Sequence, residues 1–139
     1  MSGKKILVID DEVDFAGFVG EAGRRLGYDV EVCHASAEAK RRLADIAPDL
    51  IVLDIVMPGE DGVEFLQWLR GQPLRPILIL MTGYNPKYAE MAGALGRVAG
   101  LEVAALLTKP VRIKALQEVL NKHLPLADAD ALASTTTTA

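Results

Sequence analysis

The chain has 139 residues, 50% of them hydrophobic and 24% charged, which is typical of one globular domain. Its 15 basic and 19 acidic residues leave a net charge of −4, which argues against non-specific nucleic-acid binding because phosphate backbones attract basic surfaces. A single cysteine and apolar runs far shorter than the roughly 20 residues of a membrane span lead us to expect a cytoplasmic protein with no direct DNA binding and no membrane contact.

Short apolar runs alternate along the chain with segments in which apolar residues recur at helical spacing. In chain order these are strand 6–9, helix 14–26, strand 30–33, a helix capped by Ser36 that ends before Pro48, strand 50–53, helix 63–69, strand 76–81 beginning at Pro76, helix 86 to about 95, strand 103–107 and helix 112–124. Five successive strand–helix units predict an α/β fold, a parallel sheet with helices on both faces.

Two stretches depart from this regular pattern. Gly93, Gly96 and Gly100 fall in and after the fourth helix, where a glycine costs about 1 kcal/mol against alanine. We therefore expect a short or irregular helix there and a mobile loop before the last strand. Residues 125–139 contain no large apolar cluster and end in a threonine-rich run, so we expect a domain over 1–124 and a disordered tail, with no output domain.

Chemically informative polar residues stand at the carboxyl ends of four predicted strands: Asp10, Asp11 and Glu12; Asp54; Thr82; and Lys109. In an open parallel sheet these ends share one edge, where ligands bind. Carboxylates gathered there would raise one another's pKa values unless a cation intervened, and an all-oxygen ligand set favours Mg²⁺. A carboxylate can attack a phosphoryl group and form an acyl phosphate, whose oxygens a lysine and a threonine could face. The acidic run could instead simply cap the first helix.

Four segments together resemble the receiver domains of two-component response regulators: 9–12 (IDDE), 53–62 (LDIVMPGEDG), 81–83 (MTG) and 107–110 (LTKP). The resemblance covers residues 4–124. It implies a flavodoxin-like, doubly wound five-stranded parallel sheet of order 2-1-3-4-5 with five helices.

The resemblance also implies a role for each site residue. Asp54 would be the phospho-acceptor, served by a sensor histidine kinase or a phosphotransfer protein in a phosphorelay. The implied Mg²⁺ site comprises Asp11, Asp54, the backbone carbonyl of Val56, and Asp10 acting through water. Thr82 and Lys109 would bind the phosphoryl group, and the Lys109–Pro110 peptide bond would be cis. The protein would then be a switch rather than an enzyme, with only self-catalysed transfer to and hydrolysis from Asp54. It would engage a downstream protein through helix 86–95, strand 103–107 and helix 112–124.

The sequence differs from the family pattern at the position three residues before the lysine, where many receivers carry an aromatic residue. Leu106 stands there and either simply packs or shares the switch with Thr82, and Tyr84 or Tyr88 could take over the aromatic role. Val56, two residues after Asp54, is apolar, and Tyr84 lies two residues after Thr82. We expect both to exclude attacking water and slow the loss of the phosphoryl group.

Three other functions fit parts of the pattern less well. A phosphatase with an aspartyl-phosphate intermediate would need an acid where Val56 stands. A flavin-binding module would need Ser, Thr and Gly after the first strand, where an acidic run would repel phosphate. A pure interaction module, no longer phosphorylated, would bind Mg²⁺ without accepting a phosphoryl group.

Overall fold

The apolar runs form one parallel sheet in the order β2-β1-β3-β4-β5, which confirms the predicted topology. The structure is a computed structural model that describes residues 4–56, 62–83, 86–98 and 100–126. Its strands are β1 (Lys5–Ile9), β2 (Asp29–Cys33), β3 (Leu50–Asp54), β4 (Ile77–Thr82) and β5 (Glu102–Thr108). The first and third strands, far apart in sequence, pair at the centre, and β2 and β5 are the edges.

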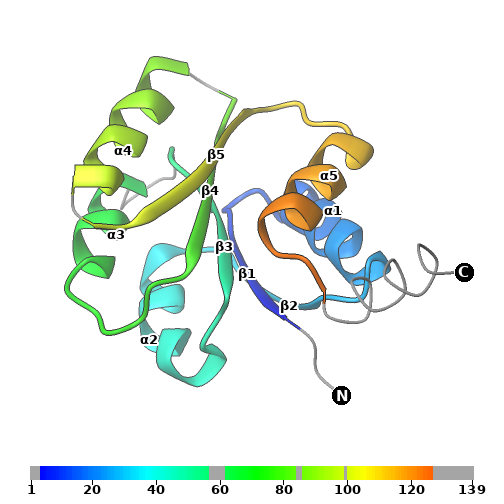
Figure 1. The fold of residues 1–139 in the computed structure, drawn as a ribbon, viewed down its shortest axis with the longest axis horizontal. Coiled ribbons are helices and arrows are strands. Elements are labelled where there is room, and N and C mark those ends of the chain that lie inside the picture. Colours follow the sequence, from blue (N-terminus) through cyan, green and yellow to red (C-terminus); the bar gives the residue numbers. More distant parts are fainter. Residues whose placement is uncertain (1–3, 57–61, 84–85, 99, 127–139) are drawn as a thin grey trace, which may run out of the picture.

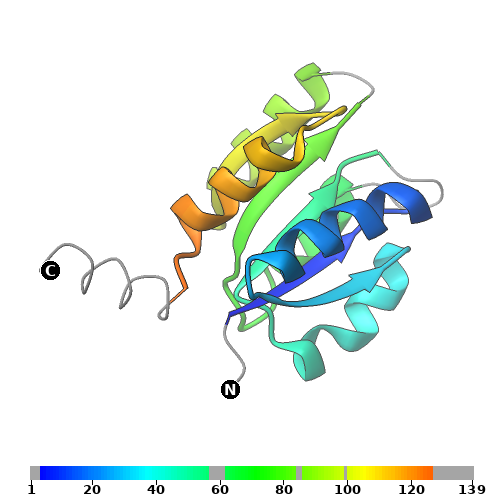
Figure 2. The same ribbon diagram turned by 90° about the vertical axis from the view of Figure 1, so that its right-hand side faces the viewer.

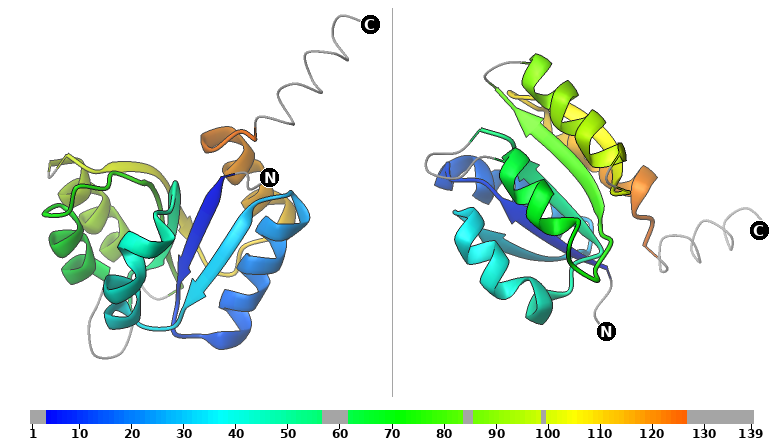
Figure 3. Two further views of the ribbon diagram at one scale, coloured as in Figure 1. Left: turned by 90° about the horizontal axis from the view of Figure 1, so that it is seen from below. Right: turned by 90° about the vertical axis from the view of Figure 1, so that its left-hand side faces the viewer.

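Five helices cover the two faces of the sheet. They are α1 (Val13–Arg25), α2 (Ser36–Ile46), α3 (Gly62–Leu69), α4 (Pro86–Val98) and α5 (Ile113–His123). Helices α1 and α5 lie together on one face, whereas α2, α3 and α4 cover the other (Figures 1 and 3). Figure 2 shows the strands running in one direction, so that their carboxyl ends gather at the same end of the sheet.

Alternating side chains of the central strands fill two separate cores. Ile6 and Val8 of β1 pack with the α1 and α5 side chains, and Leu7 and Ile9 pack with those of α2 and α3. Successive side chains of a strand point to opposite faces, so a strand covered on both sides must be apolar throughout. This explains why the central strands appear in the sequence as unbroken apolar runs.

Most predicted elements are confirmed within one or two residues, but two local assignments were wrong. Ser36 is the first residue of α2, and Ala35 is its N-cap, with extended backbone and no side-chain cap hydrogen bond. Pro76 precedes β4 instead of opening it. The end of α2 is as predicted: Ala47 takes a left-handed conformation (φ 48°) directly before Pro48, which cannot continue the helix.

The fourth helix contradicts the prediction that its glycines would make it short or irregular. It runs for 13 residues. A Cβ on Gly96 would lie 2.8 Å from Cγ2 of Val103, and one on Gly93 would lie 3.2 Å from Cδ2 of Leu106. The glycines therefore let α4 approach β5 closely, and this packing outweighs their low helix propensity.

The last strand and the chain end carry further details. The β4–β5 register shifts between Leu78 and Ile79, which leaves Ala104 outside the pairing. Leu126 packs on the α1–α5 core, and residues 127–139 of the expected tail lie outside the described residues, as does Ala99 of the expected loop. None of the helices in the described ranges has both the length and the apolar character that crossing a bilayer requires.

Candidate functional site

Side chains from four separate strand ends meet as predicted. Asp10 follows β1, Asp54 ends β3, Thr82 ends β4 and Lys109 follows β5. The Lys109 ammonium lies 2.9 Å from Oδ2 of Asp10 and 3.3 Å from Oδ2 of Asp54, and it also donates to a Glu12 carboxylate oxygen. One lysine therefore lies among three carboxylates, two from the loop after β1 and one from the end of β3.

Glu12, Asp54, Thr82 and Lys109 line a cavity of about 680 Å³. Its lining combines charged, hydroxyl and apolar groups: Asp11, Glu12, Phe15, Phe18, Asp54, Val56, Thr82, Gly83, Lys109, Pro110 and Val111. Pocket volumes of this order admit a small ligand or a partner's side chain. The Lys109–Pro110 peptide bond is cis, the isomer that the resemblance implied.

Each buried carboxylate is held by the backbone two residues further on. Oδ1 of Asp10 accepts a hydrogen bond from the Glu12 N–H at 2.9 Å, and Oδ1 of Asp54 accepts one from the Val56 N–H at 3.1 Å. This turn chemistry, common for aspartate, fixes the carboxylate plane. It leaves Oδ2 of Asp54 as the oxygen beside Lys109.

The first residue of α3 packs closely against the backbone at the end of β3. The Gly62 N–H donates to the Ile55 carbonyl at 2.7 Å, and a Cβ on Gly62 would lie 2.7 Å from the Ile55 Cα and 3.0 Å from the Asp54 carbonyl oxygen. Only glycine tolerates such a backbone approach. The glycine therefore helps to set the position of Asp54.

The pKa values of Asp54 and Lys109 are both raised, for different reasons. Burial, together with the negative charge of Asp10, raises the pKa of Asp54 to about 6, although Lys109 partly offsets the rise. Burial alone would lower the pKa of Lys109, but hydrogen bonds to Glu12 and Asp10 and the charge of Asp54 outweigh it and raise that pKa above its usual range. The site therefore pairs a permanent cation with a carboxylate that is costly to ionise.

The donor set fits a hard divalent cation. Carboxylate oxygens of Asp10, Glu12 and Asp54 lie within 4.8 Å of one another. An oxygen-only set of this kind suits Mg²⁺ better than zinc. The predicted ligands Asp11 and Val56 line the same cavity, although Asp11 is not part of that group of three.

Sequence reasoning named Glu12 in the acidic run without giving it a role of its own, and it missed Phe15. Glu12 is at the N-cap position of α1 but makes no side-chain cap hydrogen bond, and instead binds Lys109. Phe15 is one of the apolar residues that recur at helical spacing along α1. Its ring nevertheless faces the Lys109 ammonium, and the ammonium nitrogen lies 4.3 Å from the ring centroid. The helical spacing of these residues carries no signal that one of them faces a charge.

The switch candidates fall in different positions. Thr82 is fully buried at the cavity wall, and Leu106 on edge strand β5 is 38% exposed and packs against Gly93. Leu106 therefore does pack, though only in part. Tyr84 and the side chain of Tyr88 lie outside the described residues.

Residues 6–121 match the family described as the response regulator receiver domain. The alkaline phosphatase synthesis transcriptional regulatory protein PhoP of Bacillus subtilis is 36% identical over 109 residues, which cover 77% of this chain and 42% of PhoP. Response regulator MprA of Mycobacterium avium is 36% identical over 143 residues, which cover 94% of this chain and 57% of MprA. The chain thus spans about half the length of these curated relatives.

A solved structure shows the same fold. Chemotaxis protein CheY4 of Vibrio cholerae aligns with a TM-score of 0.72 at 24% identity, covering 86% of this chain and 97% of CheY4. At this identity the likeness concerns the fold alone.

Proposed function

We propose that Asp54 accepts a phosphoryl group in a two-component phosphorelay, because the chain belongs to the response regulator receiver domain family. Response regulators exchange phosphoryl groups with histidine kinases or phosphotransfer proteins, and we assign such a donor to this chain. The observation that carries the proposal is Oδ2 of Asp54, which lies 3.3 Å from the Lys109 ammonium at the edge of an open cavity.

The chemistry needs a nucleophilic oxygen and positive charge around the transferred group. Oδ2 of Asp54 would attack phosphorus, the bond from phosphorus to the donor's imidazole nitrogen would break, and the imidazole would leave with a proton. With a pKa of about 6, Asp54 is mainly ionised at neutral pH. Lys109 and the Thr82 hydroxyl would each bind an oxygen of the phosphoryl group.

The proposal includes a bound Mg²⁺. We assign Asp11, Asp54 and the Val56 carbonyl as direct ligands and Asp10 as a ligand through water. The proximity of Asp10 and Asp54, and the place of Asp11 and Val56 in the cavity lining, support this assignment. The Glu12 carboxylate is close enough to Asp10 and Asp54 to serve as a further Mg²⁺ ligand. When bound, Mg²⁺ supplies positive charge that offsets the phosphoryl oxygens.

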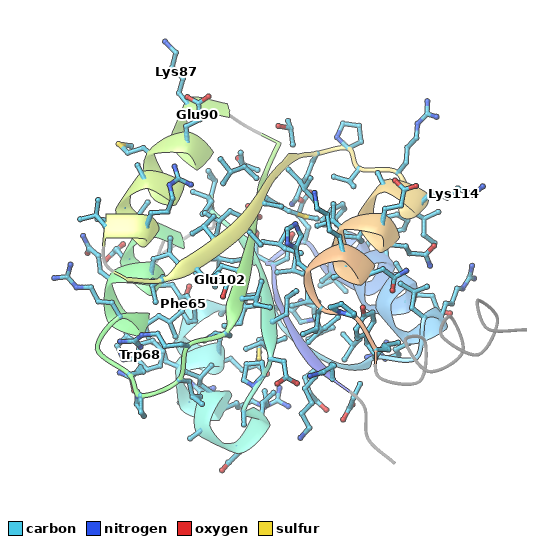
Figure 4. All side chains as sticks on the ribbon, viewed as in Figure 1. Phe65, Trp68, Lys87, Glu90, Glu102 and Lys114 are labelled. Carbon is cyan, nitrogen blue, oxygen red and sulfur yellow. The ribbon has the colours of Figure 1, made fainter. Side chains whose placement is uncertain are left out.

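Phosphorylation would alter a protein-binding surface formed by α4, β5 and α5. Met91 and Leu106 are exposed apolar side chains on this surface. Lys87 and Glu90 at the start of α4, and Lys114 at the start of α5, extend away from the sheet (Figure 4). Such a mixture of apolar and charged groups suits a protein partner. We propose Thr82 and Leu106 as switch residues, with Tyr84 as a further candidate.

The domain acts as a switch and catalyses only the transfer to and the hydrolysis from Asp54. It works in the cytoplasm, where a kinase has ATP, and makes no direct contact with DNA itself. Val56 beside the cavity keeps hydrolysis slow by excluding water.

Intact-mass measurement with a small donor tests the proposal. The chain is incubated with acetyl phosphate and Mg²⁺, beside an Asp54→Asn variant and a sample with the metal chelated. The proposal expects the mass of one added phosphoryl group in the Mg²⁺ sample only. An equal gain in the variant would contradict it, and Mg²⁺ binding without any gain would favour a phosphate-independent interaction module.

A further inference from the structure

One aromatic ring stands against the lysine of the site. Phe15 lies on the first turn of α1, and the Lys109 ammonium is 4.3 Å from the centroid of its ring. A cation over an aromatic face within about 6 Å is attracted by the negative charge of that face. A ring face takes up no oxygen-directed hydrogen bond, so the three N–H donors, which face Asp10, Glu12 and Asp54 here, can turn to other oxygens without loss of the ring contact.

The three carboxylate partners of the ammonium differ in exposure. The Asp10 and Asp54 side chains are 3% and 6% exposed, whereas the Glu12 side chain is 61% exposed and that of Lys109 13%. The contact with Glu12 is therefore the most open to solvent of the three. Phe15, by contrast, is fixed to α1 and packs on Phe18, with 5.9 Å between ring centroids.

The stem of the lysine is confined as well. A Cβ on Gly83 would lie 3.1 Å from the Cβ and 3.5 Å from the Cδ of Lys109, so the backbone of Gly83 passes close along the side chain. The stem lies against Gly83 and the ammonium against Phe15. Gly83 and Phe15 therefore help the carboxylates to fix the position of the Lys109 charge.

We propose that Phe15 is a positioning residue for phosphoryl transfer, which holds the Lys109 ammonium beside Asp54 while its N–H donors pass from the carboxylates to the incoming phosphoryl oxygens. This inference rests on the proposed phospho-acceptor function. Phe15 acts through Lys109 and need not touch the donor, so its contribution is the same for any phosphoryl donor.

The test compares donors with and without a ring. Rates of phosphorylation are measured with acetyl phosphate and with phosphoimidazole for the wild type, Phe15→Leu, Phe15→Tyr and the matched control Phe18→Leu. We expect Phe15→Leu to lower both rates by three- to tenfold, and Phe15→Tyr, which keeps the ring, to restore them to within twofold. Phe18→Leu removes the neighbouring ring of the cavity wall and should have a clearly smaller effect.

A spectroscopic readout follows the contact itself. The ε-methylene protons of Lys109, bonded next to the nitrogen that lies over the ring, should resonate upfield of their usual position in the wild type and in Phe15→Tyr, and should return to that position in Phe15→Leu. Phe18→Leu should keep the upfield shift. Ordinary resonance positions in the wild type would overturn the inference.

The kinetic outcomes separate this inference from the proposed function. A wild type that accepts no phosphoryl group would overturn both. A phosphorylated wild type with unchanged rates in Phe15→Leu would overturn the positioning role alone. A loss confined to phosphoimidazole would mean that the ring touches the donor, and an equal loss in Phe18→Leu would mean that only the cavity wall matters. Either result would overturn the role through Lys109.

Discussion

Replacing Asp54 by asparagine should stabilise the fold even though it removes the phospho-acceptor. Burial, together with the charge of Asp10, raises the pKa of Asp54 from 3.8 to about 6. That rise corresponds to about 3 kcal/mol of unfavourable free energy for the ionised group at neutral pH. Lys109 loses one carboxylate partner in the variant, so we expect a net gain of about 1–2 kcal/mol in the free energy of unfolding.

The gain should depend on pH in a defined direction. Between about pH 4 and about pH 6 the folded wild type holds a proton on Asp54 that the unfolded chain has lost, so rising pH lowers its stability. Below about pH 4 the group is protonated in both states and the penalty disappears. The advantage of Asp54→Asn should therefore be small near pH 4 and fully present above pH 6 to 7.

Urea unfolding followed by the fluorescence of Trp68, the only tryptophan, measures this directly. The chelator EDTA keeps Mg²⁺ from relieving the charge of the wild type. Asp45→Asn on the exposed surface of α2 is the matched control and should change stability by less than about 0.5 kcal/mol. The reasoning would be refuted if Asp54→Asn were no more stable than the wild type at neutral pH. It would also be refuted if the stability advantage of Asp54→Asn near pH 4 equalled the advantage at neutral pH.

Further variants test the fold and the site. Tyr28→Phe removes hydrogen bonds to two carbonyls at the end of α5 and should cost about 1 kcal/mol in urea unfolding. Because burial raises the pKa of Tyr28 to about 12, the wild type should lose stability from about pH 10 upward while the variant does not. Gly62→Ala places a Cβ 2.7 Å from the backbone and should lower the free energy of unfolding by at least about 2 kcal/mol. Gly17→Ala has open space around it and should raise the free energy of unfolding by about 0.5–1 kcal/mol in the same assay. Lys109→Met should slow phosphorylation by about 100-fold in an intact-mass time course, and an unchanged rate would remove Lys109 from the chemistry.

The sequence was sufficient to predict the sheet because its central strands are buried on both faces. The apolar run at 6–9 has no polar residue that could face water, and each of the five predicted strands is followed by a segment of helical spacing. The fourth helix was the exception. Its length depends on Gly93 and Gly96 facing Val103 and Leu106 across the α4–β5 contact, and such a tertiary contact leaves no trace in local propensity.

The convergence of the site was predictable for a related reason. Parallel strands bring their carboxyl ends to one edge, so Asp10, Asp54 and Lys109 could be placed together from their positions after apolar runs. The ring of Phe15 could not be predicted in this way. Its approach to Lys109 depends on where α1 lies over the sheet, and on the side-chain direction of a lysine that belongs to another element.

Site mapping of the phosphoryl group tests the central claim most directly. The chain is treated with acetyl phosphate and Mg²⁺, and borohydride then reduces any aspartyl phosphate to homoserine, which mass spectrometry locates in the digested chain. The account predicts homoserine at position 54 and at no other aspartate. Reduction at another acidic residue, or a phosphorylated chain in which position 54 is unmodified, would contradict it.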